Sequence, residues 1–322
     1  MMKVEGYEKR FVAFLDILGF SQLISKIEEN TCDEGDFSRV KSVLNFLHNE
    51  SQQSNGEHDL PIYEETEDGY IEKELGDPRI TYVSDCVIIS TEGSIDGYRA
   101  ICNKITKFST DIACDGLFLR GAITFGNIYH HGPLLFGTAY QRAYYLEENE
   151  VKHPRIIVDD SVFQHLSDHK DTFPLCYPHT VIDEDGKYYL ANFPLKYHPQ
   201  YVFSWDDYLL RVKGKILYHL NKFDEQVSGF GHELKSLDQR YCWKEAYGYN
   251  LNFNGGDSRV LKKYLWLKDE FNRTIETHSR WLLAGEEAAT INPKLTKGKL
   301  RISPIKQQAG YWGVEHELGR YR

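Results

Sequence analysis

The stretch FVAFLDILGFS, residues 11–21, decides the expected fold. It begins as a continuous apolar run and reaches a glycine, Gly19, a pattern typical of a buried central strand that leaves the core. The residues that follow it, 21–30, place their apolar side chains at helical spacing: Leu23, Ile24 and Ile27. The stretch therefore predicts a buried strand, a glycine turn and a helix, in that order.

Further along the chain, runs of strand and helix character alternate. The patterns predict a helix over 36–50, a loop or hairpin in the acid-rich 51–78, a hairpin over 80–90 with Ser84–Asp85 at its tip, a helix over 94–114, strand, turn and strand over 117–137, a helix over 138–150, and a strand over 154–160. This order, βααββαββαβ, predicts an α+β fold in which helices cover one face of an antiparallel sheet.

The character of the chain changes after about residue 165. A strand is expected within 186–194, and amphipathic helices are expected over 206–226 and 258–283. We therefore expect a catalytic domain over 1–165 and a largely helical C-terminal extension of unknown role over 166–322. The stretch 293–306 is basic and has no acidic residue, which is typical of a flexible cationic tail or of a patch that binds phosphates or a partner.

Composition excludes several classes of protein. The 322 residues are 41% hydrophobic and 27% charged, as in a globular protein with a proper core. A net charge of −10 argues against binding to DNA or RNA. No signal peptide and no apolar run of about 18 residues is recognised, so we expect a cytoplasmic protein that does not enter a membrane. The six cysteines form no C-x-x-C pair, and we expect reduced thiols.

Two carboxylates stand out because of where the strand pattern places them. Asp16 lies at the end of the first buried strand, and Asp85 lies at the tip of the later hairpin. If these strands are neighbours, both carboxylates emerge at one edge of the sheet. Buried like charges need compensation, and a pair of Mg²⁺ or Mn²⁺ ions would supply it. The alternative is that both are turn residues, since Asp favours turns.

Four motifs, taken together, point to a family. They are FLDILGFS at 14–21, VSD at 83–85, LRGAITFG at 119–126 and FGTAYQRA at 136–143. In this order and spacing, over about half of the chain, the sequence resembles the class III nucleotidyl cyclase domain. The resemblance implies a ferredoxin-like βααββαβ core and a homodimer of such domains placed head to tail, with active sites shared at the interface.

The resemblance also implies roles for individual residues. Asp16 and Asp85 match the two metal-binding aspartates, and the backbone carbonyl of Ile17 matches the group that completes the second metal site. Two divalent ions, Mn²⁺ or Mg²⁺, are implied in each active site. Arg120 matches an arginine that pairs with the terminal phosphates. The loop that holds the triphosphate is matched by four residues: Leu18, Gly19, Phe20 and Ser21.

The chain departs from the purine cyclases at the positions that choose the base. Thr81, followed by Tyr82, stands where adenylyl and guanylyl enzymes carry Lys or Glu, and Leu134 stands at the second selecting position. The catalytic positions differ as well. Gln141 stands where the purine cyclases carry an asparagine that acts in the transition state. Tyr145 stands where they carry the arginine that steadies the transferring phosphate, and Arg142 is a candidate to supply that cation.

These departures resemble the pyrimidine cyclases of bacterial anti-phage (Pycsar-type) defence systems. Tyr82 would then leave room for a single ring, unless it only packs in the core. The implied reaction converts UTP, with CTP as the alternative, into the 3′,5′-cyclic nucleotide and pyrophosphate. The product would act on a separate effector that senses cyclic nucleotides. Two alternatives remain open: an adenylyl or guanylyl cyclase with an unusual pocket, and a catalytically silent regulator that binds nucleotides.

Overall fold

A computed structural model describes the following parts of the chain: residues 6–32, 35–53, 62–66, 69–73, 76–167, 180–193, 208–209, 211–220, 257–283, 306–308 and 311–313. The chain divides into two compact units, Met1–Pro194 and Leu195–Arg322. The first unit therefore extends past residue 165, where the sequence placed the end of the catalytic domain. The reason is that two short strands beyond residue 165 join the main sheet.

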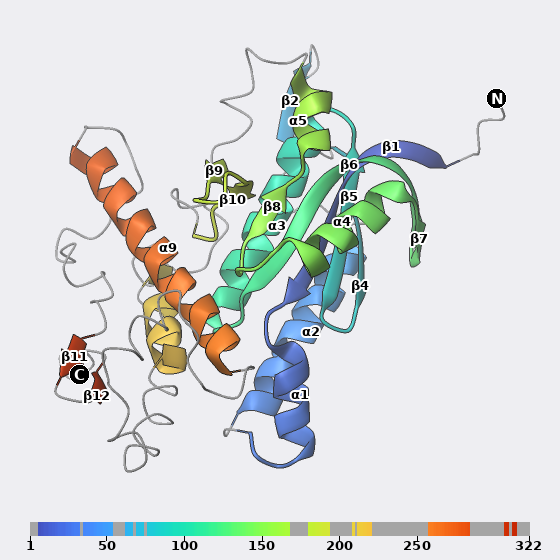
Figure 1. The fold of residues 1–322 in the computed structure, drawn as a ribbon. Helices are drawn as coiled ribbons and strands as arrows, with labels where there is room; N and C mark the ends of the chain where they lie inside the picture. Colours follow the sequence, from blue (N-terminus) through green and yellow to red (C-terminus); the bar gives the residue numbers. More distant parts are fainter. Residues whose placement is uncertain are drawn as a thin grey trace. The chain divides into compact units, whose positions relative to one another are not determined.

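The first unit is built around an eight-stranded sheet (Figure 1). Its strands follow the spatial order β4-β5-β1-β6-β8-β10-β9, and β7 pairs with β6 beside this path. The bounds of these strands are β1 Tyr7–Ile17, β4 Arg79–Val83, β5 Cys86–Glu92, β6 Leu119–His131, β7 Leu134–Phe136, β8 Ile156–Val158, β9 Thr180–Ile182 and β10 Tyr188–Leu190. The expectation of an antiparallel sheet is wrong at one place, because β6 and β8 run parallel.

The central strands and their helices have ferredoxin-like topology. After β1 the chain forms α1 (Phe20–Glu28) and α2 (Asp36–Gln53), then the hairpin β4–β5, then α3 (Ile95–Cys114), and finally β6. The four strands lie in the order β4-β5-β1-β6, and each neighbouring pair is antiparallel. This is the split β-α-β arrangement in which the first and third strands of the motif are central. The predicted fold class is confirmed.

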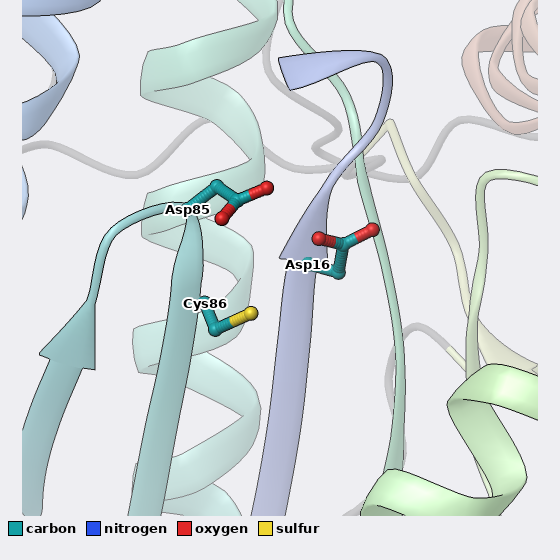
Figure 2. Close-up of side chains that lie close together, drawn as sticks. All are labelled: Asp16, Asp85 and Cys86. Carbon is teal, nitrogen blue, oxygen red and sulfur yellow. The ribbon is translucent and has the colours of Figure 1, made fainter. Parts of the chain in front are cut away.

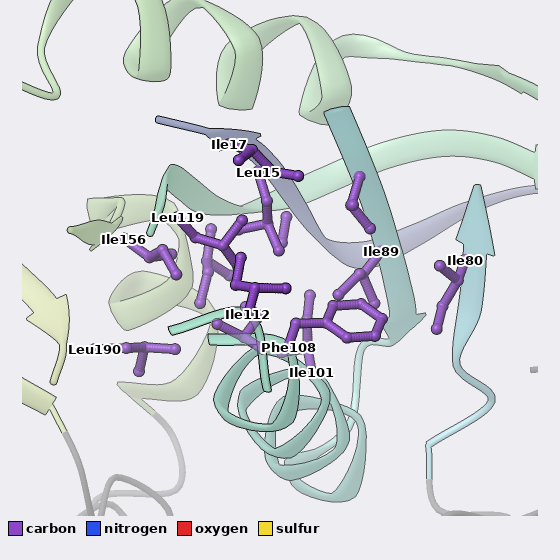
Figure 3. Close-up of a cluster of buried hydrophobic side chains, with 14 of the residues drawn as sticks. Leu15, Ile17, Ile80, Ile89, Ile101, Phe108, Ile112, Leu119, Ile156 and Leu190 are labelled. Atoms are coloured by element: carbon purple, nitrogen blue, oxygen red, sulfur yellow. The ribbon is translucent and has the colours of Figure 1, made fainter. Parts of the chain in front are cut away.

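Helices cover both faces of the sheet, which corrects the expectation of a single covered face. The odd residues of β1 pack against α1, α2, α3 and α5 (Asp160–Leu166) in the main core, part of which Figure 3 shows. The even residues Val12 and Phe14 pack under α4 (Thr138–Asn149) on the other face. Because β1 is buried on both faces, its sequence is a continuous apolar run rather than an alternating one.

The remaining expected elements are found close to their predicted places. The acid-rich segment contains the hairpin β2 (Ile62–Thr66) and β3 (Gly69–Lys73), so the hairpin alternative is confirmed. The turn between β4 and β5 is Ser84–Asp85, and Ser84 has a left-handed backbone with φ of 57°. Cys32 and Cys86 are free thiols.

The second unit contains helical residues 211–220 and the long helix α9 (Asp257–Leu283). The first lies within the predicted range 206–226, and α9 begins one residue before the predicted range 258–283. The rings of His219 and Tyr264 stack with centroids 4.3 Å apart. A short hairpin, β11 (Lys306–Gln308) and β12 (Tyr311–Gly313), follows. The predicted basic tail, apart from Lys306, falls outside the described residues. Among the helices that the structure describes, none combines the length and the apolar character needed to cross a membrane.

A chain of buried hydrogen bonds links four strands on the face covered by α4. Arg10 Nε donates to Ser90 Oγ at 3.1 Å, and Ser90 Oγ lies 2.8 Å from His130 Nδ1. His130 Nε2 lies 2.9 Å from Thr81 Oγ1, and Thr81 donates to the carbonyl of Gly132. A neutral His130 with its proton on Nε2 satisfies every link. Burial lowers the pKa of His130 to about 4, and the nearby Arg10 adds to this effect.

This histidine predicts that acid destabilises the first unit. In the unfolded chain His130 takes up a proton near its ordinary pKa of about 6.5, whereas the folded chain resists protonation down to about pH 4. The unfolded state therefore binds more protons in this window, and stability falls as pH drops through it. We expect His130 to account for a loss of about 2 kcal/mol between pH 7 and pH 5.

The measurement is urea unfolding of wild type and of His130→Gln at several values between pH 5 and pH 7. This range lies above the ordinary titration of aspartate. The variant should show a flatter dependence of unfolding free energy on pH, whatever its stability at pH 7. Equal slopes for the two proteins would contradict the prediction.

Candidate active site at the end of strand β1

The structure brings Asp16 and Asp85 together. Asp16 is near the C-terminal end of β1, and Asp85 is in the turn that precedes the neighbouring strand β5. The N–H of Ile17 donates to the carbonyl oxygen of Asp85 at 3.2 Å and so ties the two segments to each other. One ligand atom from each of Asp16, Asp85 and Cys86 lies within 4.8 Å of the others (Figure 2), and all three residues are half-buried.

Cys86 is a member of this group that sequence reasoning missed. It is the direct partner of Asp16 in the β1–β5 register, so both side chains stand on the same face of the sheet. Burial raises the pKa of the Cys86 thiol to about 12, and the nearby Asp85 and Asp16 carboxylates add to the shift. The signal that could have found it is the register of the hairpin after Asp85.

Arg120 stands on the other side of Asp16. It is the direct partner of Asp16 in the β1–β6 register, and its Nε donates to Asp16 Oδ2 at 2.9 Å. The same Nε lies 2.6 Å from Oε1 of Glu147, a residue of α4 whose side chain is only 5% exposed. Sequence reasoning missed Glu147, although its place four residues after the buried Ala143 puts it on the inner side of α4.

The charges of this group do not balance. The carboxylates of Asp16 and Glu147 both pair with the guanidinium of Arg120, and the carboxylate of Asp85 lies beside Asp16. Burial raises the pKa of Asp16 and the neighbouring Asp85 adds to the rise, while Arg120 acts against it. Bound divalent cations would relieve this excess of negative charge. The carboxylate oxygens are ligands that Mg²⁺ and Mn²⁺ prefer, so the residues fit the implied metals.

The loop expected to hold phosphates begins helix α1. Gly19 has φ of 78°, a left-handed conformation suited to glycine, and α1 starts at the buried Phe20. Ser21, in the first turn, is exposed. One expectation needs correction here: the N–H of Leu18 donates to the carbonyl of Phe118 at 2.8 Å and is engaged within the fold. The N–H groups at the start of α1 are those of Gly19 and of the residues that follow it.

The two candidates on β4 point to opposite faces of the sheet. Tyr82 packs against the main core, and its hydroxyl lies 3.0 Å from Nδ1 of His48 on α2. Asp16 belongs to the face that α4 covers, so this position argues against Tyr82 as a wall of the same pocket. Thr81 is on the α4 face, but it is buried and its hydroxyl is engaged by His130 and Gly132.

The remaining candidates lie on the surface. Leu134, on β7, is 63% exposed. Gln141, Arg142 and Tyr145 occupy the exposed side of α4, whose inner side carries Glu147. Arg142 donates to Asp159 Oδ1 at 2.9 Å and lies over the ring of Tyr145. These side chains therefore face away from the interior of the chain that contains them.

Comparison with solved structures finds guanylyl cyclase domains. One is the monomeric guanylyl cyclase domain of the RhoGC fusion protein from the aquatic fungus Blastocladiella emersonii, at 14% identity and a TM-score of 0.35. The alignment covers 57% of this chain and 95% of that one. Another is the catalytic core of a rhodopsin-guanylyl cyclase with converted specificity, in complex with ATPαS, at 15% identity and a TM-score of 0.34. That alignment covers 57% of this chain and 96% of the other. No protein-family model and no curated protein matches this sequence.

The ion pair between Arg120 and Glu147 predicts an unequal response to two arginine substitutions. Arg120→Ala would leave the buried Glu147 carboxylate without this guanidinium, and we expect a loss of about 2–4 kcal/mol in unfolding free energy. The matched control is Arg142→Ala, which removes an arginine that is 47% exposed and should cost about 1 kcal/mol or less. Urea unfolding of both variants measures the difference. Equal losses would contradict the structural role of the Arg120 pair.

Proposed function

We propose that this protein is a nucleotidyl cyclase that converts a pyrimidine nucleoside triphosphate into the 3′,5′-cyclic nucleotide and pyrophosphate. UTP is the proposed substrate, with CTP as the alternative. The observation that carries the proposal is the meeting of Asp16 and Asp85 beside a glycine turn that opens helix α1. Carboxylates next to a helix N-terminus make a site that suits metal ions and a triphosphate together.

In this proposal the protein supplies mainly position and charge. Asp16, Asp85 and the carbonyl of Ile17 would hold two divalent ions, which when bound neutralise the triphosphate and lower the pKa of the ribose 3′-hydroxyl. The N–H groups of Gly19, Phe20 and Ser21 would bind phosphate oxygens. The 3′-hydroxyl would release its proton to water as the 3′-oxygen bonds to the α-phosphorus, while the bond from that phosphorus to the oxygen that bridges it to the β-phosphate breaks and pyrophosphate leaves. Arg120 would stabilise the negative charge of the phosphates.

The choice of a pyrimidine rests on the residues at the two base-selecting positions. Thr81 and Leu134 carry no charge, whereas the resemblance implies Lys or Glu at the first of these positions in purine enzymes. The hydroxyl of Thr81 already donates to Gly132, which limits what it could donate to a base. Tyr82 does not support this choice, since it faces α2. The alternatives are an adenylyl or guanylyl cyclase with an unusual pocket and a silent nucleotide-binding regulator.

We further propose that the active enzyme is a homodimer with shared sites. Large apolar side chains lie exposed on β7 and α4: Leu134, Phe136, Tyr144 and Tyr145. Exposed apolar groups of this kind mark interaction surfaces. In this arrangement Gln141 and Arg142 would serve the site of the partner subunit. The cyclic product would then act on a separate effector protein, as a second messenger in defence against phage.

The direct test is to incubate the full chain with each of the four nucleoside triphosphates and Mn²⁺ and to resolve the cyclic products. We expect cyclic UMP or cyclic CMP, together with one molecule of pyrophosphate for each molecule of cyclic nucleotide. Asp16→Ala and Asp85→Ala should each reduce the rate by more than about a thousandfold, because the ions lose their ligands. A cyclic purine as the main product would support the second alternative. Nucleotide binding without any product would support the silent regulator.

The shared site predicts complementation between inactive variants. Mixing Asp16→Ala with Arg142→Ala should restore activity, because each heterodimer would contain one site with both defects and one intact site. At full exchange about half of the dimers are mixed, so we expect about a quarter of the wild-type rate. The control mixes Asp16→Ala with Asp85→Ala, whose defects would lie in different sites of the heterodimer with no intact one. The absence of recovery, once mixed dimers are demonstrated, would overturn the shared site.

A further inference from the structure

The thiol of Cys86 lies among the carboxylates of the candidate site. Cys86 and Asp16 are direct partners across β1 and β5, and Asp85 precedes Cys86 in the chain. Figure 2 shows the sulfur of Cys86 pointing toward the strand that carries Asp16. Among the residues that the structure describes, this is the one group of three such side chains whose ligand atoms lie within 4.8 Å of one another.

This mixture of donors suits a different class of metal from the oxygen-only pair. Zn²⁺ and Cd²⁺ accept both thiolate and carboxylate ligands, and zinc binds them at about 2.3 Å and about 2.0–2.2 Å. Tetrahedral ligands at these distances lie about 3.3–3.8 Å apart. The three atoms, all within 4.8 Å of one another, would therefore need to close by at most about 1.5 Å, which side-chain rotation can supply. Mg²⁺ has little affinity for sulfur, so Cys86 adds nothing to its binding.

Arg120 leaves room for such an ion. It binds Oδ2 of Asp16, and a carboxylate has a second oxygen that faces a different direction. Arg120 stands on the β6 side of Asp16, while Cys86 and Asp85 stand on the β5 side. A cation on the β5 side would thus be bound opposite the guanidinium rather than in its place.

We propose that Asp16, Asp85 and Cys86 form a site for a single thiophilic divalent cation of the Zn²⁺ or Cd²⁺ class, whose binding inhibits the enzyme. As the metal–sulfur bond forms, the thiol proton is released to solvent. The inhibitory part rests on the proposed function, since the ion would occupy the two carboxylates that the catalytic pair of ions needs. The binding part does not depend on any activity.

The binding test is a titration of the metal-free full chain with Cd²⁺, followed through the ultraviolet charge-transfer absorption of the cadmium–thiolate bond. Wild type should show a saturable band at one ion per chain, and Cys86→Ser should lose it and weaken Cd²⁺ binding by more than tenfold. Cys32→Ser, a half-buried cysteine outside the group, is the matched control and should keep the band. Asp85→Asn retains the thiol and should also weaken binding by more than tenfold.

Circular dichroism identifies a variant that folds poorly. If either Cys86→Ser or Asp85→Asn does so, the other variant still tests the site. A band of equal size and affinity in wild type and Cys86→Ser would overturn the proposal. So would full binding by a folded Asp85→Asn, because the thiol would then bind cadmium without the carboxylate.

The inhibition test measures the Zn²⁺ concentration that halves the Mn²⁺-supported rate, relative to the uninhibited rate of the same variant. Cys86→Ser should raise this concentration more than tenfold over wild type and over Cys32→Ser. An unchanged concentration, with the cadmium band lost, would overturn the inhibitory part alone. A wild type that cyclises no nucleotide without Zn²⁺ would refute the proposed function and leave the cadmium result standing.

Discussion

Strand β1 is hydrogen-bonded to β5 on one side and to β6 on the other, and it is packed on both faces. Every part of the candidate site depends on this position. A residue near the end of such a strand is partly shielded from water, yet it lies beside the turn where the chain leaves the sheet. Asp16 therefore has Cys86 and Arg120 as fixed neighbours in register, and the helix that could bind phosphates starts four residues later. Neither neighbour can move away from Asp16 without breaking the pairing of the central strands.

The electrostatics of the site follow from this placement. Asp16 lies in partial burial with Asp85 nearby, and the guanidinium of Arg120 partly compensates the Asp16 carboxylate while it also pairs with Glu147. The Asp85 carboxylate lies on the β5 side of Asp16, and the Arg120 guanidinium lies on the β6 side. A metal and Arg120 can thus share the Asp16 carboxylate from opposite directions, so that binding a cation need not expel the arginine. The ion pair with Glu147 on α4 holds Arg120 beside Asp16.

The elements and the two aspartates could be predicted because their signals are local. Apolar periodicity marks strands and helices, and an acid next to a glycine turn or a hairpin tip stands out in the sequence itself. The members that were missed depend on pairing: Cys86 is defined by its partner Asp16 on β1, and Glu147 by the face of α4 that packs on the sheet. The packing of Tyr82 against the main core has a related origin. Side chains alternate along a strand, so Tyr82 shares its face with the core residue Ile80, and Thr81 takes the other. The covered second face and the strands past residue 165 likewise depend on long-range packing.

Two glycines, one in the motif LRGAITFG and one in FGTAYQRA, allow the backbone segments around the candidate site to approach each other closely. A Cβ on Gly121 would lie 2.2 Å from the carbonyl oxygen of Phe14, so only glycine lets β6 approach β1 this closely beside Arg120. A Cβ on Gly137 would lie 2.4 Å from the carbonyl oxygen of Asn127, so this glycine lets α4 begin directly against β6. Arg120 directly precedes Gly121 on β6, and Glu147 lies on the helix that follows Gly137, so the two members of this ion pair stand on the segments that these glycines bring close to their neighbours. The glycines therefore belong to the motifs because they bring the backbone together, and Arg120 and Glu147, which lie on either side of them in the sequence, depend on that proximity for their contacts.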